Sequence, residues 1–195
     1  LVYRYLVEFH NNHSSDFYYQ IRSKKFRSLY RSAARTIYLN RTCWNALYRV
    51  NLNGDFNVPI GTKQNAIYET DDFNKVSELL HTSVITCDDF EATIAQAGSK
   101  DFIFVDPPYT VNHNKNGFLK YNEKIFSWDD QMRLRDAIEN AVTRGAMVLI
   151  TNANHESVRD LYADFHQTEL NRSSVISGKN SGRGTFSELI VTCGL

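Results

Sequence analysis

The stretch FIFVDPPYT, Phe102 to Thr110, runs a short apolar segment directly into an acid, two prolines and an aromatic residue. FIFV has the length and composition of a buried β-strand, and the prolines end it because they lack a backbone N–H. A plain turn needs only one Gly or Pro. The stretch is therefore either a Pro-Pro turn with a strand-end Asp106 and a core Tyr109, or a loop that carries chemistry. Its position directly after a strand favours the second interpretation.

The C-terminal part of the chain alternates between predicted strands and helices. Besides 102–105, strands are expected at residues 83–87 and 147–151 and in the tail around QTELN and SELIVT. Helices are expected at residues 89–97, 128–145 and 155–165. Apolar strands that alternate with helices predict an α/β fold with a mostly parallel sheet that is covered on both faces. Ligands of such sheets bind beyond the carboxyl ends of the strands, where Asp106 lies.

The N-terminal part is predicted to be mostly helical, with helices at residues 1–10, 26–40 and 72–81 and a tight loop at Asn53-Gly54. Its charge is strongly biased, because no acid lies between Asp16 and Asp55. Eight bases lie there: Arg22, Lys24, Lys25, Arg27, Arg31, Arg35, Arg41 and Arg49. From Asp55 through Asp106 the balance reverses to ten acids and three lysines. This asymmetry predicts a lobe that faces a polyanion, joined to a neutral or acidic one.

Bulk composition excludes several classes of protein. The 195 residues carry a formal net charge of zero, and no apolar run approaches the roughly 18 residues that a membrane span needs. Three widely spaced cysteines favour a reducing compartment over a disulfide framework, and neither they nor the six histidines show metal-ligand spacing. We therefore expect a soluble, cytoplasmic protein of a bacterial or phage-infected cell, without a metal and without a membrane partner.

The residues of DPPY suit one class of reaction. The exocyclic amino group of adenine or cytosine is a poor nucleophile, because its lone pair is delocalised into the ring. The carboxylate of Asp106 and the carbonyl of Pro107 can accept hydrogen bonds from its two N–H groups, and Pro107 and Pro108 fix the direction of that carbonyl. Acceptors placed in advance stabilise charge that develops in the transition state. The ring of Tyr109 offers a face on which a flipped base can stack.

The chain resembles the Dam-family DNA adenine-N6 methyltransferases over nearly its whole length. The resemblance rests, in order, on YLNRTCWNALYRVNLNGDFNVPIG, CDDF, FIFVDPPYT, GFLKYNEKIFSWDDQMRL, VLITNANHESVRDLY and RSSVISGKNSGRGTFSELIVT. It implies a Rossmann-like methyltransferase sheet with a small, mostly helical DNA-recognition subdomain. It also implies S-adenosyl-L-methionine as the methyl donor and a flipped adenine in double-stranded DNA, in a site of the GATC type, as the acceptor.

The resemblance assigns roles to individual residues and segments. Asp106, Pro107, Pro108 and Tyr109 would hold the target base, and Asp89, Phe90 and Asp106 would contact the donor. The expected DNA contacts are Arg41, Trp44, Asn45, Leu47, Arg49 and Pro59, with Arg49 bidentate to a guanine. Residues 1–25 would be a helical segment of the catalytic domain, 26–75 the recognition subdomain and 76–195 the catalytic domain. We expect a monomer on DNA.

Other residues leave two interpretations open. Arg27, Arg31 and Arg35 lie on one helical stripe and suit phosphate contact and simple exposure equally. Phe118 and Tyr121 suit either closure over the flipped adenine or packing. SGKNSGRG, residues 177–184, is expected to be a hairpin between the last two strands, with Arg172 and Arg183 as weaker phosphate candidates.

The pattern of the family also contains a glycine-rich F-x-G-x-G turn after an N-terminal strand, and these 195 residues show no such turn. We therefore expect an N-terminally truncated form of an active enzyme, so that this chain alone binds the donor weakly or not at all. The alternatives are a non-catalytic DNA-binding fragment and one half of a split methyltransferase. A methyltransferase for amide-type nitrogens of protein or RNA is a further alternative, although such enzymes more often have Asn before the two prolines.

Overall fold

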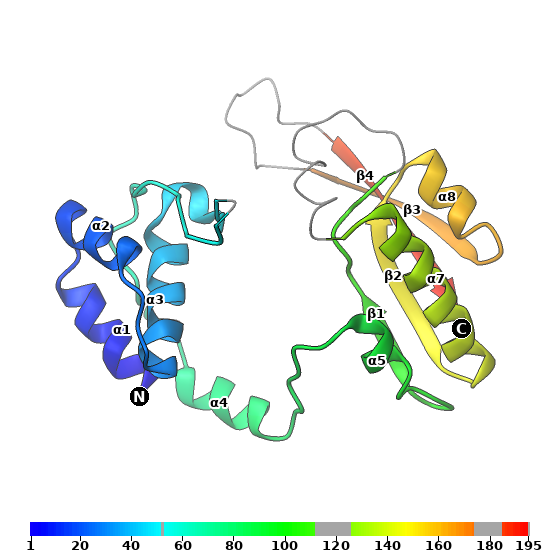
Figure 1. The fold of residues 1–195 in the computed structure, drawn as a ribbon, viewed down its shortest axis with the longest axis horizontal. Coiled ribbons are helices and arrows are strands. Elements are labelled where there is room, and N and C mark those ends of the chain that lie inside the picture. The colour runs from blue at the N-terminus through cyan, green and yellow to red at the C-terminus, as the bar shows by residue number, and fades with distance from the viewer. Residues whose placement is uncertain (52, 112–125, 174–184, 195) are drawn as a thin grey trace. The chain divides into compact units, whose positions relative to one another are not determined.

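The computed structural model describes residues 1–51, 53–111, 126–173 and 185–194. The chain forms two compact units, Leu1–Ile85 and Thr86–Leu195 (Figure 1). Each unit has a buried apolar core of its own. In the described ranges, no helix is long and apolar enough to cross a membrane.

Three helices build the core of the first unit: α1 (Val2–Asn11), α2 (Ser15–Ser23) and α3 (Leu29–Thr42). The hydroxyls of Ser14 and Ser28 accept hydrogen bonds from the first turns of α2 and α3 and so cap both helices. Phe9 and Tyr38 are fully buried, with their ring centroids 5.7 Å apart. The predicted helix at 1–10 is confirmed as α1, and the one at 26–40 is confirmed as α3, which begins three residues later, at Leu29. No separate helix was predicted at the residues of α2.

The rest of the first unit is irregular up to its last helix. The 3-10 helix Trp44–Ala46 follows α3, and isolated bridges then pair Cys43 with Ile60 and Val50 with Phe56. The tight loop at Asn53-Gly54 is confirmed, because Gly54 has φ +79° and its N–H donates to the carbonyl of Asn51. Helix α4 (Phe73–His81) begins at an Asp72 cap, as residues 72–81 predicted.

The second unit contains a four-stranded sheet with the order β1-β2-β4-β3. The strands are β1 (Phe102–Val105), β2 (Met147–Ala153), β3 (His166–Ser173) and β4 (Thr185–Cys193). β1 and β2 run parallel, with Val105 opposite Ile150, and both pairings of β4 are antiparallel. The α/β class is therefore confirmed, but the expectation of a mostly parallel sheet is wrong for the described strands.

Helices α5 (Phe90–Ile94), α7 (Trp128–Thr143) and α8 (Glu156–Leu161) accompany this sheet. They pack on one face, where alternate residues of β2 and β4 such as Val148, Ile150 and Val191 are fully buried. A capping box between Ser127 and Asp130 begins α7. The opposite face presents Phe102 and Phe104, which are 56% and 61% exposed, so the described helices of this unit cover one face and not both as predicted.

One predicted strand does not form. Residues 83–87 have no regular structure, and Val84 and Ile85 are 92% and 73% exposed. A strand is stable only when its backbone groups find partners on a neighbouring strand, and no described segment offers residues 83–87 such a partner. The predicted hairpin at 177–184 lies outside the described residues, as do Phe118, Tyr121 and Arg183, and nothing is described of the side chain of Arg172.

Candidate active site and candidate DNA-contact loop

Asp106 lies directly beyond the carboxyl end of β1 in the second unit. Its side chain is exposed, and Oδ1 accepts a hydrogen bond of 2.7 Å from the hydroxyl of Thr151 on the neighbouring strand β2. Pro107 is buried, whereas Pro108 and Tyr109 are partly buried. The four predicted catalytic residues therefore leave the sheet as one loop with the carboxylate on its solvent side.

Buried hydrogen bonds hold the end of this loop. The hydroxyl of Thr110 donates to the carbonyl of Phe126 at 2.7 Å. The amide of Gln131, on α7, donates to the carbonyl of Thr110 at 3.2 Å and exchanges hydrogen bonds with the side chain of Asn152. Thr110, Gln131 and Asn152 are almost completely buried, so these bonds form away from water and fix the loop against β2 and α7.

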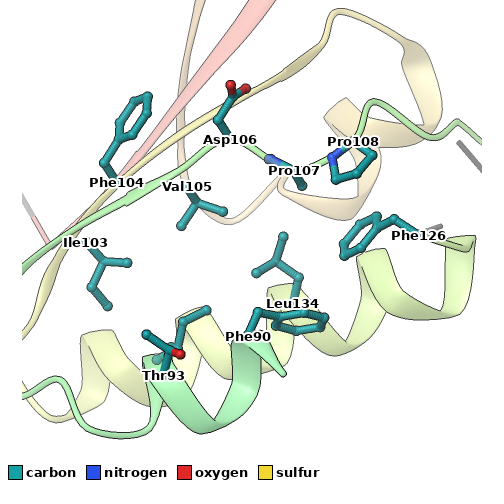
Figure 2. A pocket seen from close by; sticks show the side chains of 11 residues that line it. Phe90, Thr93, Ile103, Phe104, Val105, Asp106, Pro107, Pro108, Phe126 and Leu134 are labelled. Atoms are coloured by element: carbon teal, nitrogen blue, oxygen red, sulfur yellow. The ribbon is translucent and has the colours of Figure 1, made fainter. Parts of the chain in front are cut away.

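A hollow of about 350 Å³ lies beside the loop and is mainly apolar (Figure 2). Its lining includes Phe90, Val105, Asp106, Pro107 and Phe126. Figure 2 shows Val105 pointing toward Phe90, while Asp106 points to the other side of the strand. The carboxylate of Asp106 thus lies at the rim of the hollow and remains accessible to a polar group.

The predicted donor-contact pair, Asp89 and Phe90, forms the start of α5. A carboxylate oxygen of Asp89 accepts a hydrogen bond from the N–H of Glu91, so Asp89 caps the helix. The guanidinium of Arg133 bonds both carboxylate oxygens of Asp89 at 3.1 Å and lies over the ring of Phe90. Phe90 lines the hollow, but Asp89 does not, so the structure brings Phe90 and Asp106 to the hollow and turns Asp89 toward Arg133.

Arg133 is the centre of an acidic cluster that also contains Glu91 and Asp130. The N–H of Glu91 and the guanidinium of Arg133 lower the pKa of Asp89. Hydrogen bonds from Ser127, followed by Arg133, lower the pKa of Asp130. This cluster joins the first turns of α5 and α7 and so holds the ring of Phe90 in the wall of the hollow. No local pattern predicted this cluster, because Arg133 lies 42 and 44 residues from Glu91 and Asp89 along the chain.

In the first unit, the segment that follows α3 is pinned by a second segment. The N–H of Trp44 donates to the carbonyl of Pro59 at 2.9 Å, and the N–H of Gly61 donates to the carbonyl of Thr42 at 2.8 Å. Gly61 is required for this approach, because a Cβ there would lie 2.4 Å from the carbonyl oxygen of Cys43. The hydroxyl of Tyr18 on α2 also donates to the carbonyl of Val58.

Five of the predicted DNA-contact residues are exposed on these paired segments: Trp44, Asn45, Leu47, Arg49 and Pro59. Trp44 is 54% exposed, which is unusual for so large an apolar side chain. Asn45 and Ala46 have φ values of 55° and 53°. Left-handed conformations cost energy for residues other than Gly and are concentrated at functional sites. The loop therefore presents an aromatic side chain on a strained turn.

Arg49 and Arg41 differ in what holds them. The Nε of Arg49 bonds to Oδ1 of Asn57, a residue that the sequence did not single out, and the side chain remains exposed. Arg41 forms two hydrogen bonds with the carboxylate of Asp71 and one with the carbonyl of Ala66. These contacts lower the pKa of Asp71 and give Arg41 a structural task, so its contact with DNA stays a prediction.

The three arginines of the predicted basic stripe, Arg27, Arg31 and Arg35, differ in their contacts. Arg31 pairs with Glu8, and Arg35 donates to the carbonyls of Ile21 and Arg22, while burial lowers its pKa. These contacts favour a structural role for both. Arg27 is exposed. Because Arg31, Arg41 and also Lys25 form ion pairs with acids distant in the sequence, the positive lobe is less free of acids than the sequence predicted.

The described residues contain no group of three or more His, Cys, Asp or Glu side chains that could hold a metal ion. A hollow with one carboxylate and apolar walls suits an organic ligand with a positive charge. The aromatic loop of the first unit suits a stack of bases.

Comparison with known proteins points in the same direction. The model of the D12 class of N6 adenine-specific DNA methyltransferases matches residues 1–176. A Type II methyltransferase of Lactococcus lactis subsp. cremoris is 33% identical, over 96% of this chain and 70% of its own length. A DNA adenine methylase of Serratia marcescens is 32% identical, over 94% of this chain and 68% of its own length. The DNA N-6-adenine-methyltransferase of Escherichia phage P1 is 35% identical, over 85% of this chain and 22% of its own length.

Proposed function

Because the chain belongs to the D12 class of N6 adenine-specific DNA methyltransferases, we propose that it acts in the transfer of a methyl group from S-adenosylmethionine to the N6 amino group of an adenine in double-stranded DNA. The observation that carries the proposal is the exposed carboxylate of Asp106 at the carboxyl end of β1, followed by two prolines and Tyr109. Ligand sites of α/β sheets lie at this edge.

The residues around the hollow fit the methyl donor. Phe90 offers an aromatic face for an adenine ring, and the carboxylate of Asp106 offers a negative charge for a cationic ligand. A volume of about 350 Å³ is at the lower end of the range for small-molecule sites. When bound, S-adenosylmethionine supplies a methyl group whose bond to sulfur breaks as the bond to N6 forms and a proton of N6 is released.

The chain's own residues prepare the amino group. Oδ2 of Asp106 and the carbonyl of Pro107 accept hydrogen bonds from the two N–H groups, which turns the lone pair of nitrogen out of conjugation with the ring. The ring of Tyr109 supports the flipped base by stacking. These acceptors are fixed before the reaction, since Pro107 is buried and Thr110 is anchored by Gln131.

The loop of the first unit is the proposed DNA contact. Trp44 and Asn45 fill the gap that a flipped adenine leaves in the base stack, and Leu47, Arg49 and Pro59 contact base edges in the major groove. A site of the GATC type suits these contacts. Arg41 contributes by holding the end of α3 in place through Asp71.

The test replaces Asp106 by Ala and by Asn and measures N6-methyladenine in duplex DNA by mass spectrometry, with DNA affinity measured by fluorescence anisotropy. Both variants should lose at least about 100-fold in methyl transfer while DNA affinity stays the same. Asp129→Asn is the matched control, because Asp129 is an exposed acid in the first turn of α7, outside the lining of the hollow. Near-normal turnover of either Asp106 variant would remove Asp106 from the mechanism. Tight DNA binding by the wild-type protein without any methylation would favour the non-catalytic alternative.

A further inference from the structure

Among the described residues, the hydroxyl of Thr151 donates a hydrogen bond of 2.7 Å to the carboxylate of Asp106. The contact follows from the register of the sheet. Parallel strands β1 and β2 place Val105 opposite Ile150, so the next residues, Asp106 and Thr151, point to the same face. The pairing is therefore built into the backbone and does not depend on a flexible loop.

This hydrogen bond restricts a side chain that would otherwise rotate. An exposed aspartate has two free torsions, and a short hydrogen bond to a charged oxygen selects one orientation. The bond occupies Oδ1, while Oδ2 has no partner among the described residues. Thr151 thus leaves one oxygen of Asp106 free to accept from an amino group and fixes the direction in which it points.

The donor is itself held rigidly. The neighbouring Asn152 points to the opposite, buried face of β2 and bonds with Gln131, which in turn bonds the carbonyl of Thr110. The end of β2 therefore holds the DPPYT loop from both faces of the sheet: Thr151 holds its acid, and Asn152 holds its last residue through Gln131. A donor on such a fixed strand can impose its geometry on the acceptor.

We propose that Thr151 is a positioning residue of the proposed methylation, and that its hydroxyl orients Asp106 so that Oδ2 meets the amino group of the target adenine. The inference rests on the proposed function and deepens it. It assigns Thr151 no contact with the donor or with DNA. Loss of the hydroxyl should therefore slow the chemical step and leave the binding of both ligands unchanged.

The experiment compares Thr151→Val, which keeps the branched shape without the hydroxyl, with Thr151→Ser, which keeps the hydroxyl. In the wild-type protein and both variants, kcat and KM for duplex DNA are measured with labelled S-adenosylmethionine. Thr151→Val should lower kcat roughly 10- to 100-fold, because small misplacement of a reacting group has effects of this size. KM should stay within about twofold, and Thr151→Ser should recover kcat to within about threefold of the wild type.

Two further measurements separate positioning from stability. Thr192→Val removes a hydroxyl from the same sheet, on β4 opposite Leu149, and should leave kcat unchanged. Duplex DNA with 2-aminopurine at the mapped target position reports base flipping by fluorescence. Because 2-aminopurine lacks the 6-amino group that Asp106 would contact, Thr151→Val should leave the flipped fraction at saturation unchanged. Thermal unfolding of each variant shows that it is folded.

The results distinguish the inference from the function on which it rests. A folded Thr151→Val variant with kcat within about twofold of the wild type would overturn the positioning role. Equal losses of kcat in Thr151→Val and Thr151→Ser would also overturn it. If the wild-type protein forms no N6-methyladenine on any duplex, the proposed function itself fails, whatever the variants do.

Discussion

The Nε of Arg49 donates a hydrogen bond of 2.9 Å to Oδ1 of Asn57 across the turn that follows the exposed Trp44 loop. The backbone supports this contact, because the N–H of Asn57 donates to the carbonyl of Arg49 at 3.2 Å. Among the described residues, the two Nη atoms of Arg49 have no partner. Asn57 thus holds the guanidinium by one nitrogen and leaves the others free for the acceptors of a guanine.

Arg49→Ala should relax discrimination at one guanine of the target site, at a cost of about 1–3 kcal/mol. Methylation mapping on a library of duplex sites measures the preference at each position. Asn57→Ala should change the same position by a smaller amount, because the guanidinium remains but is no longer oriented. Arg27→Ala, which removes an exposed base from the start of the α3 region, should leave the site preference unchanged. An unaltered preference in Arg49→Ala would show that this residue does not contact a base.

Gly61→Ala should strongly destabilise the first unit. The added Cβ would lie 2.4 Å from the carbonyl oxygen of Cys43, so the segments that hold Trp44 and Pro59 must separate. Overpacking of this kind costs about 1–3 kcal/mol, and urea unfolding measures it. Gly98→Ala is the matched control, since a Cβ there meets nothing within 4 Å, and it should be close to neutral. Equal stability of the two variants would contradict the tight approach of Gly61 to Cys43.

Gln131→Leu should destabilise the second unit by about 1–3 kcal/mol, because it removes the acceptor of the buried Nδ2 of Asn152 and the amide that donates to the carbonyl of Thr110. Equilibrium unfolding in urea gives the change in free energy. Met132→Leu, on the exposed side of the same helix, should change the stability little. The same loss in both variants would indicate a general effect on α7 and no special role for the buried bonds.

Arg133→Met should change the acid dependence of stability. The pKa values of Asp89 and Asp130 are lowered from 3.8 in the folded protein, by the hydrogen bonds at their helix starts and by Arg133. Their contribution is therefore present above about pH 4 and is lost as the pH falls below 3.8. At neutral pH the variant leaves Asp89, Glu91 and Asp130 facing one another without a cation, so it should be less stable than the wild type, and the difference should shrink on acidification.

The free energy of unfolding, measured between pH 7 and about pH 3, checks this expectation. Arg144→Met provides the control, because within the described part of the chain Arg144 bonds the carbonyls of Ala97 and Ile94 and no carboxylate, so its effect should not depend on pH over this range. A difference between wild type and Arg133→Met that stays constant with pH would refute the linkage between Arg133 and the carboxylates.

Local patterns were sufficient to predict much of the fold. FIFV formed a strand at the residues predicted, and Asp106 follows it at an exposed strand end, because an apolar run bounded by prolines is a strong local signal. The strand expected at 83–87 failed, since strand formation depends on a partner that local sequence does not specify. The antiparallel insertion of β4 between β2 and β3 likewise depends on long-range pairing.

In the candidate sites, too, local motifs could be predicted from the sequence, whereas contacts between distant residues could not. DPPY was singled out because it is a contiguous motif with a chemical meaning, and the residues from Trp44 to Arg49 were singled out through the family resemblance. Their contacts with the donor and with DNA stay predictions. Thr151, Gln131 and Asn57 were missed, since their roles depend on contacts across 45, 21 and 8 residues of the chain. Charge counting also overlooked the pairing of Arg41 with Asp71, which lies 30 residues away. Motifs predict which groups can react, and the packing of distant residues decides how each group is held.

β1 is the last strand at one end of the sheet, and Phe102 and Phe104 stand exposed on it. Among the described residues, only β2 pairs with this strand. An apolar strand with a free edge is a template on which a second copy of the chain can add its own strand. The four residues that place Asp106 thus also form an apolar edge, and any strand that pairs with this edge would lie directly beside the strand end that carries the carboxylate.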